Sequence, residues 1–309
     1  MKIVFLGTPR FAVNVLDALV QSKHEVLAVV TQPDKVNGRK NSISFGEVKT
    51  YALAHGLNVL QFANISAEGE DILRNLAPDI MVTCAYGQIL KQNILDICPI
   101  WNVHASLLPK YRGSSPVQWA LINGEEEVGV TIMKTERGVD TGDMILKGSI
   151  HLDGDEDSEE TLEKLSSLGA ELIIRALDAC ENGTVCYEKQ NEAEATHCRM
   201  LKKEDGLIDF SKEAIEVKNF IRGMNPWPGA FTSLSAYGKL KIFRAKVCAG
   251  EGGETPGEVI SADPKKGWTV KCGEGYLQLL TVQGENAKVM DAKAYLLGHK
   301  IAIGSVLGE

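Results

Sequence analysis

The chain has 309 residues, and at that length a single hydrophobic core usually gives way to two domains. Hydrophobic residues make up 44% of it, as in ordinary globular proteins, but no apolar run approaches the roughly 18 residues that a membrane helix needs. The formal net charge of −8 argues against a nonspecific nucleic-acid-binding protein.

The first apolar run, within residues 1–7, is too short for a secretory signal and instead predicts a first strand. We therefore expect a cytoplasmic protein. The seven cysteines are scattered and contain no Cys-x-x-Cys pair, so we expect reduced and mostly buried thiols. A metal site is the alternative use of such cysteines, and we expect none.

Apolar runs typical of strands alternate with helical patterns through the first half of the chain. This alternation predicts a doubly wound, mostly parallel α/β sheet with crossover helices. Ligands of such sheets bind beyond the carboxyl ends of the strands. The expected strands span residues 2–6, 25–31, 80–84, 100–104, 128–133 and 144–150, and the expected helices span residues 11–22, 48–55, 114–123 and 158–181.

A polar, weakly patterned segment follows this half of the chain. We expect a first domain over residues 1–187, a linker over residues 188–205 and a second domain over residues 206–309. The second domain should open with a helix over residues 211–221, capped by Ser211. Short runs punctuated by Gly and Pro then predict a small β-barrel with strands over residues 239–247, 257–261, 268–272 and 276–282.

Charge is divided unevenly between these regions. Residues 206–309 hold 13 Lys/Arg and 11 Asp/Glu, a balance of +2, whereas residues 1–205 hold 20 and 30, a balance of −10. A neutral-to-basic module beside an acidic one is compatible with docking one specific RNA. Ordinary variation of surface charge is the alternative explanation.

The first expected strand is followed by Gly7-Thr8-Pro9, where a dinucleotide-binding fold would carry its glycines. The sequence lacks both the G-x-G-x-x-G fingerprint and the P-loop pattern G-x-x-x-x-G-K-[ST]. We therefore expect a Rossmann-like sheet that binds neither NAD nor ATP.

An asparagine and a histidine alternate in the strand expected over residues 100–104. Because side chains repeat every second residue along a strand, Asn102 and His104 should share one face. They would offer an amide donor beside an imidazole, and a carboxylate from the Gly-rich turn at residues 138–143 could orient that imidazole or move its proton. This combination suits acyl transfer. Taken singly, a histidine in an apolar stretch and aspartates in a turn are more often structural.

The same residues carry a family resemblance. The stretch Asn-x-His-x-Ser-Leu-Leu-Pro at residues 102–109, followed by Asp-x-Gly at residues 140–142, resembles the folate-dependent formyltransferases. Similarity to the methionyl-tRNA formyltransferases within that family covers nearly the whole chain. It is carried by Gly-Thr-Pro-x-Phe at residues 7–11, Ala-Tyr-Gly at residues 85–87 and Ile-Arg-Gly-Met-Asn-Pro-Trp-Pro-Gly-Ala at residues 221–230. The resemblance implies that the small barrel is of the OB-like, oligonucleotide-binding type.

The resemblance also implies an activity, which is transfer of the formyl group of 10-formyltetrahydrofolate to the α-amine of methionine on initiator tRNA. It assigns catalysis to Asn102, His104 and Asp140 and leaves Asp143 to stabilise the turn. The implied partners are folate and charged initiator tRNA. We expect no metal cofactor, no membrane contact and a monomer.

Binding residues follow from the same resemblance. Folate contacts are expected from Tyr86, Gly87, Ser106, Leu107, Leu108 and Pro109. Contacts with tRNA are expected from Arg39 and Lys40 in a polar loop and from Arg222 beside a Pro-rich turn. The loop departs from the family pattern, because Asn41-Ser42-Ile43 stands where more basic residues are usual. Ser114-Ser115 likewise replaces a pair of alanines.

Three rival functions are compatible with parts of this pattern. They are formyl transfer to glycinamide ribonucleotide or an amino sugar, hydrolysis that releases formate from the same folate, and non-catalytic folate or nucleotide sensing. The appended residues 206–309 argue against a small free substrate, and the presence of Asn102, His104 and Asp140 together argues against a sensor.

Overall fold

A computed structural model describes residues 1–37 and 42–308. The chain folds as two compact units. The first, called the N-terminal unit below, is formed by Met1–Gly113, Glu127–Ile150 and Leu162–Cys198. The second, called the C-terminal unit, is formed by Ser114–Glu126, His151–Thr161 and Arg199–Glu309. Each unit therefore takes residues from several stretches of the chain.

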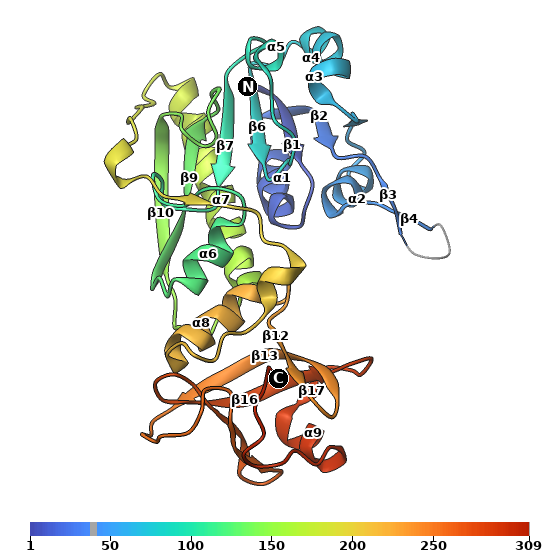
Figure 1. Cartoon of the computed structure of the whole chain (residues 1–309). Helices are drawn as coiled ribbons and strands as arrows, with labels where there is room; N and C mark the ends of the chain where they lie inside the picture. Colours follow the sequence, from blue (N-terminus) through green and yellow to red (C-terminus); the bar gives the residue numbers. More distant parts are fainter. Residues whose placement is uncertain (38–41, 309) are drawn as a thin grey trace. The chain divides into compact units, whose positions relative to one another are not determined.

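The N-terminal unit is built around a seven-stranded sheet in the order β10-β9-β7-β6-β1-β2-β5 (Figure 1). Strands β5, β2, β1, β6 and β7 run parallel, and β9 runs antiparallel to β7. The predicted doubly wound, mostly parallel α/β fold is confirmed. The strands are β1 (Lys2–Gly7), β2 (Glu25–Thr31), β5 (Val59–Gln61), β6 (Ile80–Cys84), β7 (Ile100–His104), β9 (Glu127–Lys134) and β10 (Met144–His151).

The central strands β1 and β6 are continuous apolar runs. Every residue of β6, and every residue of β1 after Lys2, is buried. Such runs are typical of parallel strands, because layers packed on both faces of the sheet exclude water from them. From β1 the chain continues to β2 and β5 on one side of the sheet, whereas β6 and β7 lie on the other side of β1. The strand order therefore reverses between β1 and β6. Ligands of open α/β sheets bind at such a topological switch.

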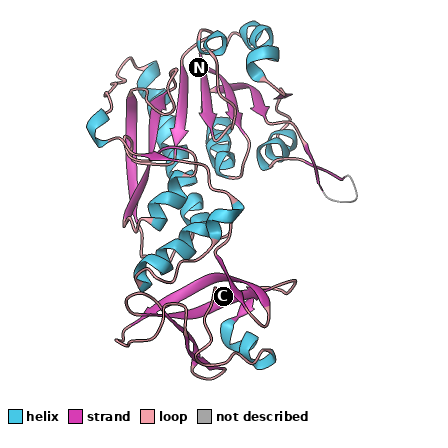
Figure 2. Ribbon diagram, viewed as in Figure 1, coloured by secondary structure: helices cyan, strands magenta, loops and turns pink. Residues whose placement is uncertain are grey.

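Helices pack along this sheet (Figure 2). The buried residues of α1 recur three or four positions apart, as expected for one helix face. In α7, Gly169 allows a close approach to β7, because a Cβ atom there would lie 2.8 Å from Val103. The helices of this unit are α1 (Phe11–Gln21), α2 (Glu47–Ala54), α3 (Ile65–Glu68), α4 (Glu70–Leu76), α5 (Gln92–Leu95) and most of α7 (Ser158–Glu181). A separate two-stranded sheet pairs β3 (Lys35–Asn37) with β4 (Ser42–Ser44).

The C-terminal unit contains an antiparallel sheet in the order β12-β13-β16-β15-β14, with β17 paired to β16. Its strands curl into a half-barrel (Figure 2), which confirms the predicted small barrel. Trp268 is fully buried inside it and stacks on Tyr295, with ring centroids 5.8 Å apart. The elements are α6 (Pro116–Ile122), α8 (Ala214–Met224), β12 (Phe231–Leu234), β13 (Gly238–Cys248), β14 (Val259–Asp263), β15 (Gly267–Lys271), β16 (Tyr276–Gly284), β17 (Met290–Asp291) and α9 (Ala292–Gly298).

Helix α8 starts later than the sequence pattern predicts. It begins at Ala214, where Glu213 and Glu216 form a capping box. Ser211 does not cap it, because the Ser211 hydroxyl donates to the Asp209 carboxylate at 2.6 Å. The predicted cap at Ser211 was therefore wrong, since an aspartate two residues earlier forms a local turn with that serine.

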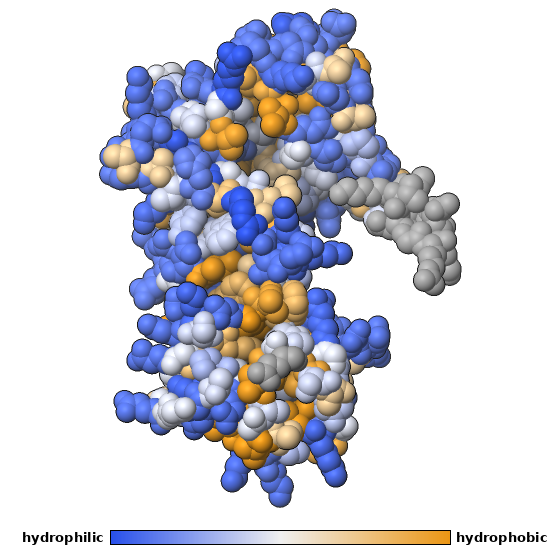
Figure 3. Space-filling model, in the orientation of Figure 1, coloured by the Kyte–Doolittle hydropathy of each residue, from blue (hydrophilic) through white to orange (hydrophobic). Residues whose placement is uncertain are grey.

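Hydrophilic side chains cover most of the face shown in Figure 3, with small groups of apolar residues between them. Across residues 1–37 and 42–308, no helix is long and apolar enough to cross a bilayer. The same residues contain no group of three or more His, Cys, Asp or Glu side chains arranged to hold a metal ion. All seven cysteines are unpaired.

Candidate active site

Strand β7 is regular through Asn102 and His104, so their side chains point to the same face of the sheet. Asn102 lies opposite Thr83 of β6 and Met133 of β9. The Thr83 hydroxyl donates to Asn102 Oδ1 at 2.9 Å. Because this contact engages the amide oxygen of Asn102, its NH2 group, a donor, is turned away from Thr83.

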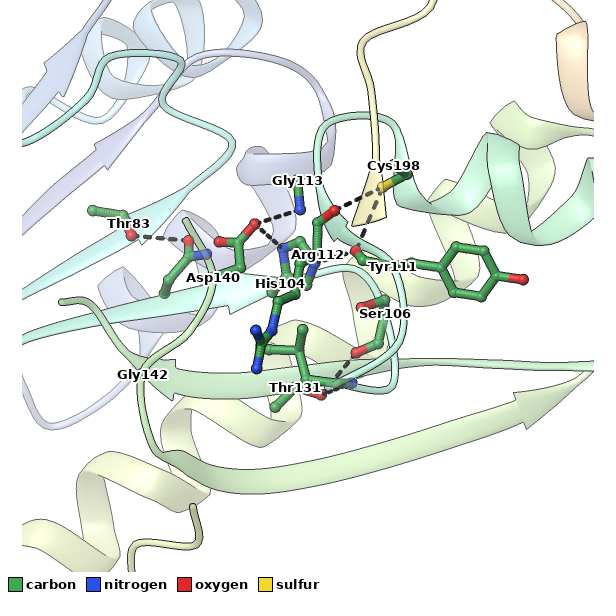
Figure 4. Close-up of polar contacts among 12 residues, drawn as sticks. Thr83, His104, Ser106, Tyr111, Arg112, Gly113, Thr131, Asp140, Gly142 and Cys198 are labelled. Atoms are coloured by element: carbon green, nitrogen blue, oxygen red, sulfur yellow. Dashed lines mark hydrogen bonds and ion pairs between the residues drawn. The ribbon is translucent and has the colours of Figure 1, made fainter. Parts of the chain in front are cut away.

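His104 is only 6% exposed, and each of its ring nitrogens faces an oxygen atom of the protein. Its Nε2 lies 3.0 Å from the carbonyl oxygen of Tyr111, and because a carbonyl can only accept, Nε2 carries a proton. Its Nδ1 lies 3.7 Å from Asp140 Oδ2 (Figure 4). In the neutral ring Nδ1 therefore has a lone pair on the side of the carboxylate. A proton taken up there would form an ion pair with Asp140.

Asp140 belongs to the turn between β9 and β10 and adopts a left-handed conformation, with φ +52°. Its Oδ2 accepts a hydrogen bond from the Gly113 N–H at 2.8 Å (Figure 4). A side chain at Gly142 would be excluded, because its Cβ would lie 1.9 Å from the Lys134 carbonyl oxygen. Asp143 closes the turn through its main chain, where its carbonyl oxygen accepts from the Lys134 N–H at 2.9 Å.

The loop that follows β7 is stiffened by hydrogen bonds to its own main chain. Thr131 of β9 donates its hydroxyl to the Ser106 carbonyl oxygen at 2.7 Å and accepts from the Leu108 N–H at 3.1 Å. Of the four loop residues predicted to contact folate, Ser106, Leu108 and Pro109 are buried and Leu107 is half-buried. The loop therefore offers a ligand its main chain and the Leu107 side chain.

Tyr86 and Gly87 form the turn that follows β6. Thr8 and Gln32 both donate from their side chains to the Tyr86 carbonyl oxygen, at 3.4 and 3.0 Å. The Tyr86 ring packs into the core, its hydroxyl has no hydrogen-bond partner in the described part of the chain, and burial raises the pKa of that hydroxyl to about 12. Gly87 has φ +86°, which glycine adopts without strain. A ligand at this edge would meet the Gly87 main chain and not the Tyr86 ring.

Of the three residues predicted to contact tRNA, the structure describes only Arg222. Arg39 and Lys40 lie outside the described residues. Arg222 lies in α8 and is only 6% exposed, its Nε donates to Asn219 Oδ1 at 2.9 Å, and burial lowers its pKa. Contrary to the prediction, Arg222 packs inside the C-terminal unit and presents no charge at the surface. Its position beside the apolar stripe of α8 is the reason.

Sequence reasoning missed a segment that lies against the site. Residues 188–198 run along the turn that carries Asp140 and along the loop after β7, and two of them, Gln190 and Glu192, bind Arg112. Arg112 is only 2% exposed; its two terminal nitrogens donate to the two Glu192 carboxylate oxygens at 2.9 and 2.7 Å, and its Nε donates to Gln190 Oε1 at 2.9 Å. The Glu192 carboxylate raises the pKa of Arg112. No sequence signal identified this segment, because the burial of Arg112, which requires a carboxylate partner, is visible only in the structure.

Two family models match the chain. One, described as formyl transferase, matches residues 1–177, and the other, described as formyl transferase, C-terminal domain, matches residues 200–300. The methionyl-tRNA formyltransferase of Caldanaerobacter subterraneus subsp. tengcongensis is 45% identical over 312 residues, which cover 99% of this chain and 100% of that protein.

Two solved structures are similar in fold. The N-formyltransferase from Helicobacter canadensis, in complex with folinic acid and dTDP-3-aminofucose, matches with a TM-score of 0.70 and 20% identity over 92% of this chain and 100% of that one. The methionyl-tRNA formyltransferase from Clostridium thermocellum matches with a TM-score of 0.57 and 16% identity over 94% of this chain and 99% of that one. At these identities the likeness shows the fold alone.

Proposed function

Because the chain belongs to the formyl transferase family and is similar over its full length to methionyl-tRNA formyltransferases, we propose that it formylates the α-amine of methionine on initiator tRNA. The formyl donor is 10-formyltetrahydrofolate, and the product is N-formylmethionyl-tRNA for translation initiation. The observation that carries this proposal is the grouping of an amide donor, an imidazole and a carboxylate, Asn102, His104 and Asp140, at the carboxyl end of β7.

The chemistry begins with the amine, whose reference pKa of about 7.7 to 8.0 means that a fraction of it is already neutral near neutral pH, its ammonium proton having gone to solvent. When the neutral amine bonds to the formyl carbon, its nitrogen becomes positively charged. His104 takes one proton from that nitrogen at Nδ1, directly or through a water molecule, and the Asp140 carboxylate 3.7 Å away stabilises the resulting imidazolium. The Tyr111 carbonyl keeps Nε2 protonated, so Nδ1 is the nitrogen that exchanges the proton.

Attack of the amine nitrogen on the formyl carbon forms one C–N bond and a tetrahedral oxyanion. The NH2 group of Asn102, oriented by Thr83, donates to that oxyanion. The bond between the formyl carbon and N10 of the folate then breaks, and the proton held by His104 passes to N10. One proton leaves the amine and one reaches N10, so His104 returns to its starting form.

Folate binding is assigned to the turn at Tyr86–Gly87 and to the loop from Ser106 to Pro109. Both follow parallel strands at the topological switch, where ligands of such sheets bind. The complex of the Helicobacter canadensis relative with folinic acid supports a folate at this fold. Because Tyr86 and most of the loop side chains are buried, recognition at this chain relies on main-chain groups and on Leu107.

The tRNA is assigned to the second domain, residues 206–309, and to Arg39 and Lys40 of the first domain, residues 1–187, with residues 188–205 joining the two. The charge balances of +2 and −10 support this division, because phosphates bind cations. The protein would act as a monomer in the cytoplasm. Wild-type affinity for tRNA should weaken as salt rises.

One assay tests the proposed function. The full chain is supplied with 10-formyltetrahydrofolate and, in parallel, with methionyl-initiator tRNA, glycinamide ribonucleotide, an amino-sugar nucleotide or water alone. We expect formyl transfer to the charged tRNA only. Transfer to a small amine at a comparable kcat/KM, or release of formate in water alone at a comparable rate, would overturn the proposal.

A further inference from the structure

Residues 188–198 form a strap that joins the two loops of the active site. At one end, Glu188 and Met144 exchange main-chain hydrogen bonds of 2.8 and 2.9 Å beside the catalytic turn. At the other end, β11 (His197–Cys198) pairs in parallel with β8 (Arg112–Gly113) in the loop after β7. Between these ends the strap passes both the turn that carries Asp140 and the loop that faces His104.

Gln190 lies near the Glu188 end of the strap, and both the nitrogen and the oxygen of its amide form hydrogen bonds. Its Nε2 donates to the main-chain carbonyl oxygens of Asp140 and Gly142, each at 2.8 Å. Its Oε1 accepts from Arg112 Nε at 2.9 Å. These three contacts leave one orientation for the amide, because the reversed amide would set its oxygen against two carbonyls and its NH2 against a guanidinium.

Arg112 is a fixed support for this amide. Buried at 2% exposure, it is held by the Glu192 carboxylate at both terminal nitrogens. The next residue, Gly113, donates its N–H to the Asp140 carboxylate. Two contacts therefore connect Asp140 to Arg112–Gly113. Its carboxylate accepts from the Gly113 N–H, and its carbonyl oxygen accepts from Gln190, which in turn binds Arg112.

The left-handed conformation of Asp140 explains why both contacts are needed to hold the turn. A non-glycine residue at φ +52° persists only where its surroundings over-determine it. Without the Gln190 donors, two carbonyl oxygens of the turn lose their partner and the left-handed conformation loses support. The 3.7 Å separation between the Asp140 carboxylate and His104 Nδ1 depends on that conformation.

We propose that Gln190 is a positioning residue. By binding both Arg112 and the main chain of the turn that carries Asp140, it holds the Asp140 carboxylate next to His104 Nδ1. The inference rests on the proposed role of Asp140 in formyl transfer. Gln190 itself would touch neither folate nor the amine. Its loss should therefore act on turnover through Asp140, and not on substrate binding.

Two variants of Gln190 separate its contacts. Gln190→Met keeps the length of the side chain and removes all three hydrogen bonds. Gln190→Glu keeps an acceptor for Arg112 and replaces the NH2 donor with an oxygen that repels the two carbonyls. Both should lower kcat about 10- to 100-fold, the cost of a displacement near 1 Å in a catalytic group, while KM for folate and for charged tRNA stays unchanged. Gln92→Met is the matched control, because Gln92 donates to Asp96 on an exposed helix, and its kcat should equal that of the wild type.

The decisive measurement is a double-mutant cycle with Asp140→Asn. If Gln190 acts through the Asp140 carboxylate, adding Gln190→Glu to Asp140→Asn should produce little further loss of kcat. Full additivity of the two losses, or an unchanged kcat in Gln190→Glu alone, would overturn the inference while leaving the proposed function intact. An unchanged kcat in Asp140→Asn alone would instead overturn the role of Asp140 in that function. Because Gln190→Glu retains the Arg112 contact, it answers the question even if Gln190→Met does not fold.

Discussion

Replacing Asp140 by Asn removes the negative charge and keeps a side chain of the same size and geometry. The Asn side chain keeps an oxygen that can accept from the Gly113 N–H, so the turn should survive. What disappears is the attraction between the carboxylate and a protonated His104. The two side chains are 17% and 7% exposed, and Oδ2 lies 3.7 Å from Nδ1. With an effective dielectric constant of about 20, that attraction is worth about 4 kcal/mol as a gross value.

A loss of about 4 kcal/mol from the transition state corresponds to a fall in turnover of about three orders of magnitude. Solvent and the retained hydrogen bond reduce this figure, so we expect kcat to fall about 100- to 1000-fold, the range seen when one group that stabilises developing charge is removed. The free energy of unfolding should change by less than about 1 kcal/mol, because the contact with Gly113 is kept.

Single-turnover formylation of methionyl-tRNA measures the chemical step, and thermal unfolding in the same buffer measures stability. Asp143→Asn is the control, because Asp143 contributes its main-chain carbonyl to the turn and this substitution leaves that group in place. Asp143→Asn should lose far less turnover than Asp140→Asn. If the order is reversed, the carboxylate has been assigned to the wrong residue.

Two further predictions concern residues that pack around the site. Tyr86→Phe removes a buried hydroxyl that lacks a partner among the described residues, so the free energy of unfolding should stay the same or rise by up to about 1 kcal/mol; an increased KM for folate would show instead that this hydroxyl binds the ligand. Gly169→Ala would bring a Cβ to 2.8 Å from Val103 and should lower the free energy of unfolding by about 1 to 3 kcal/mol; an unchanged melting temperature would contradict the close packing of α7 on β7.

Some elements of the fold escaped sequence reasoning for local reasons. The strands β5 and β12 are short, at three and four residues, and carry too little alternation to be recognised. The start of α8 was misplaced because Ser211 has a competing partner in Asp209. Arg222 was expected to contact tRNA because of the family resemblance, yet its place on the packed side of α8 buries it.

The sequence by itself determined the fold class and the placing of Asn102 and His104 on one face of a strand. Continuous apolar runs are compatible with a buried parallel sheet, and a spacing of two residues puts both side chains on one face of any strand. Both signals depend only on residues close together in the chain, where the geometry of a strand is the same in every protein. They are therefore readable before the chain is folded.

Only the tertiary structure decided which nitrogen of His104 faces Asp140 and which residue holds the turn. The Tyr111 carbonyl oxygen that accepts from the Nε2–H, and the Asp140 and Gly142 carbonyl oxygens that accept from Gln190, are main-chain groups, which every residue carries and no motif marks. Gln190 is 50 residues from Asp140 along the chain. Contacts of this kind depend on how distant loops meet at the sheet edge, so they exist only once the strands that carry those loops have paired.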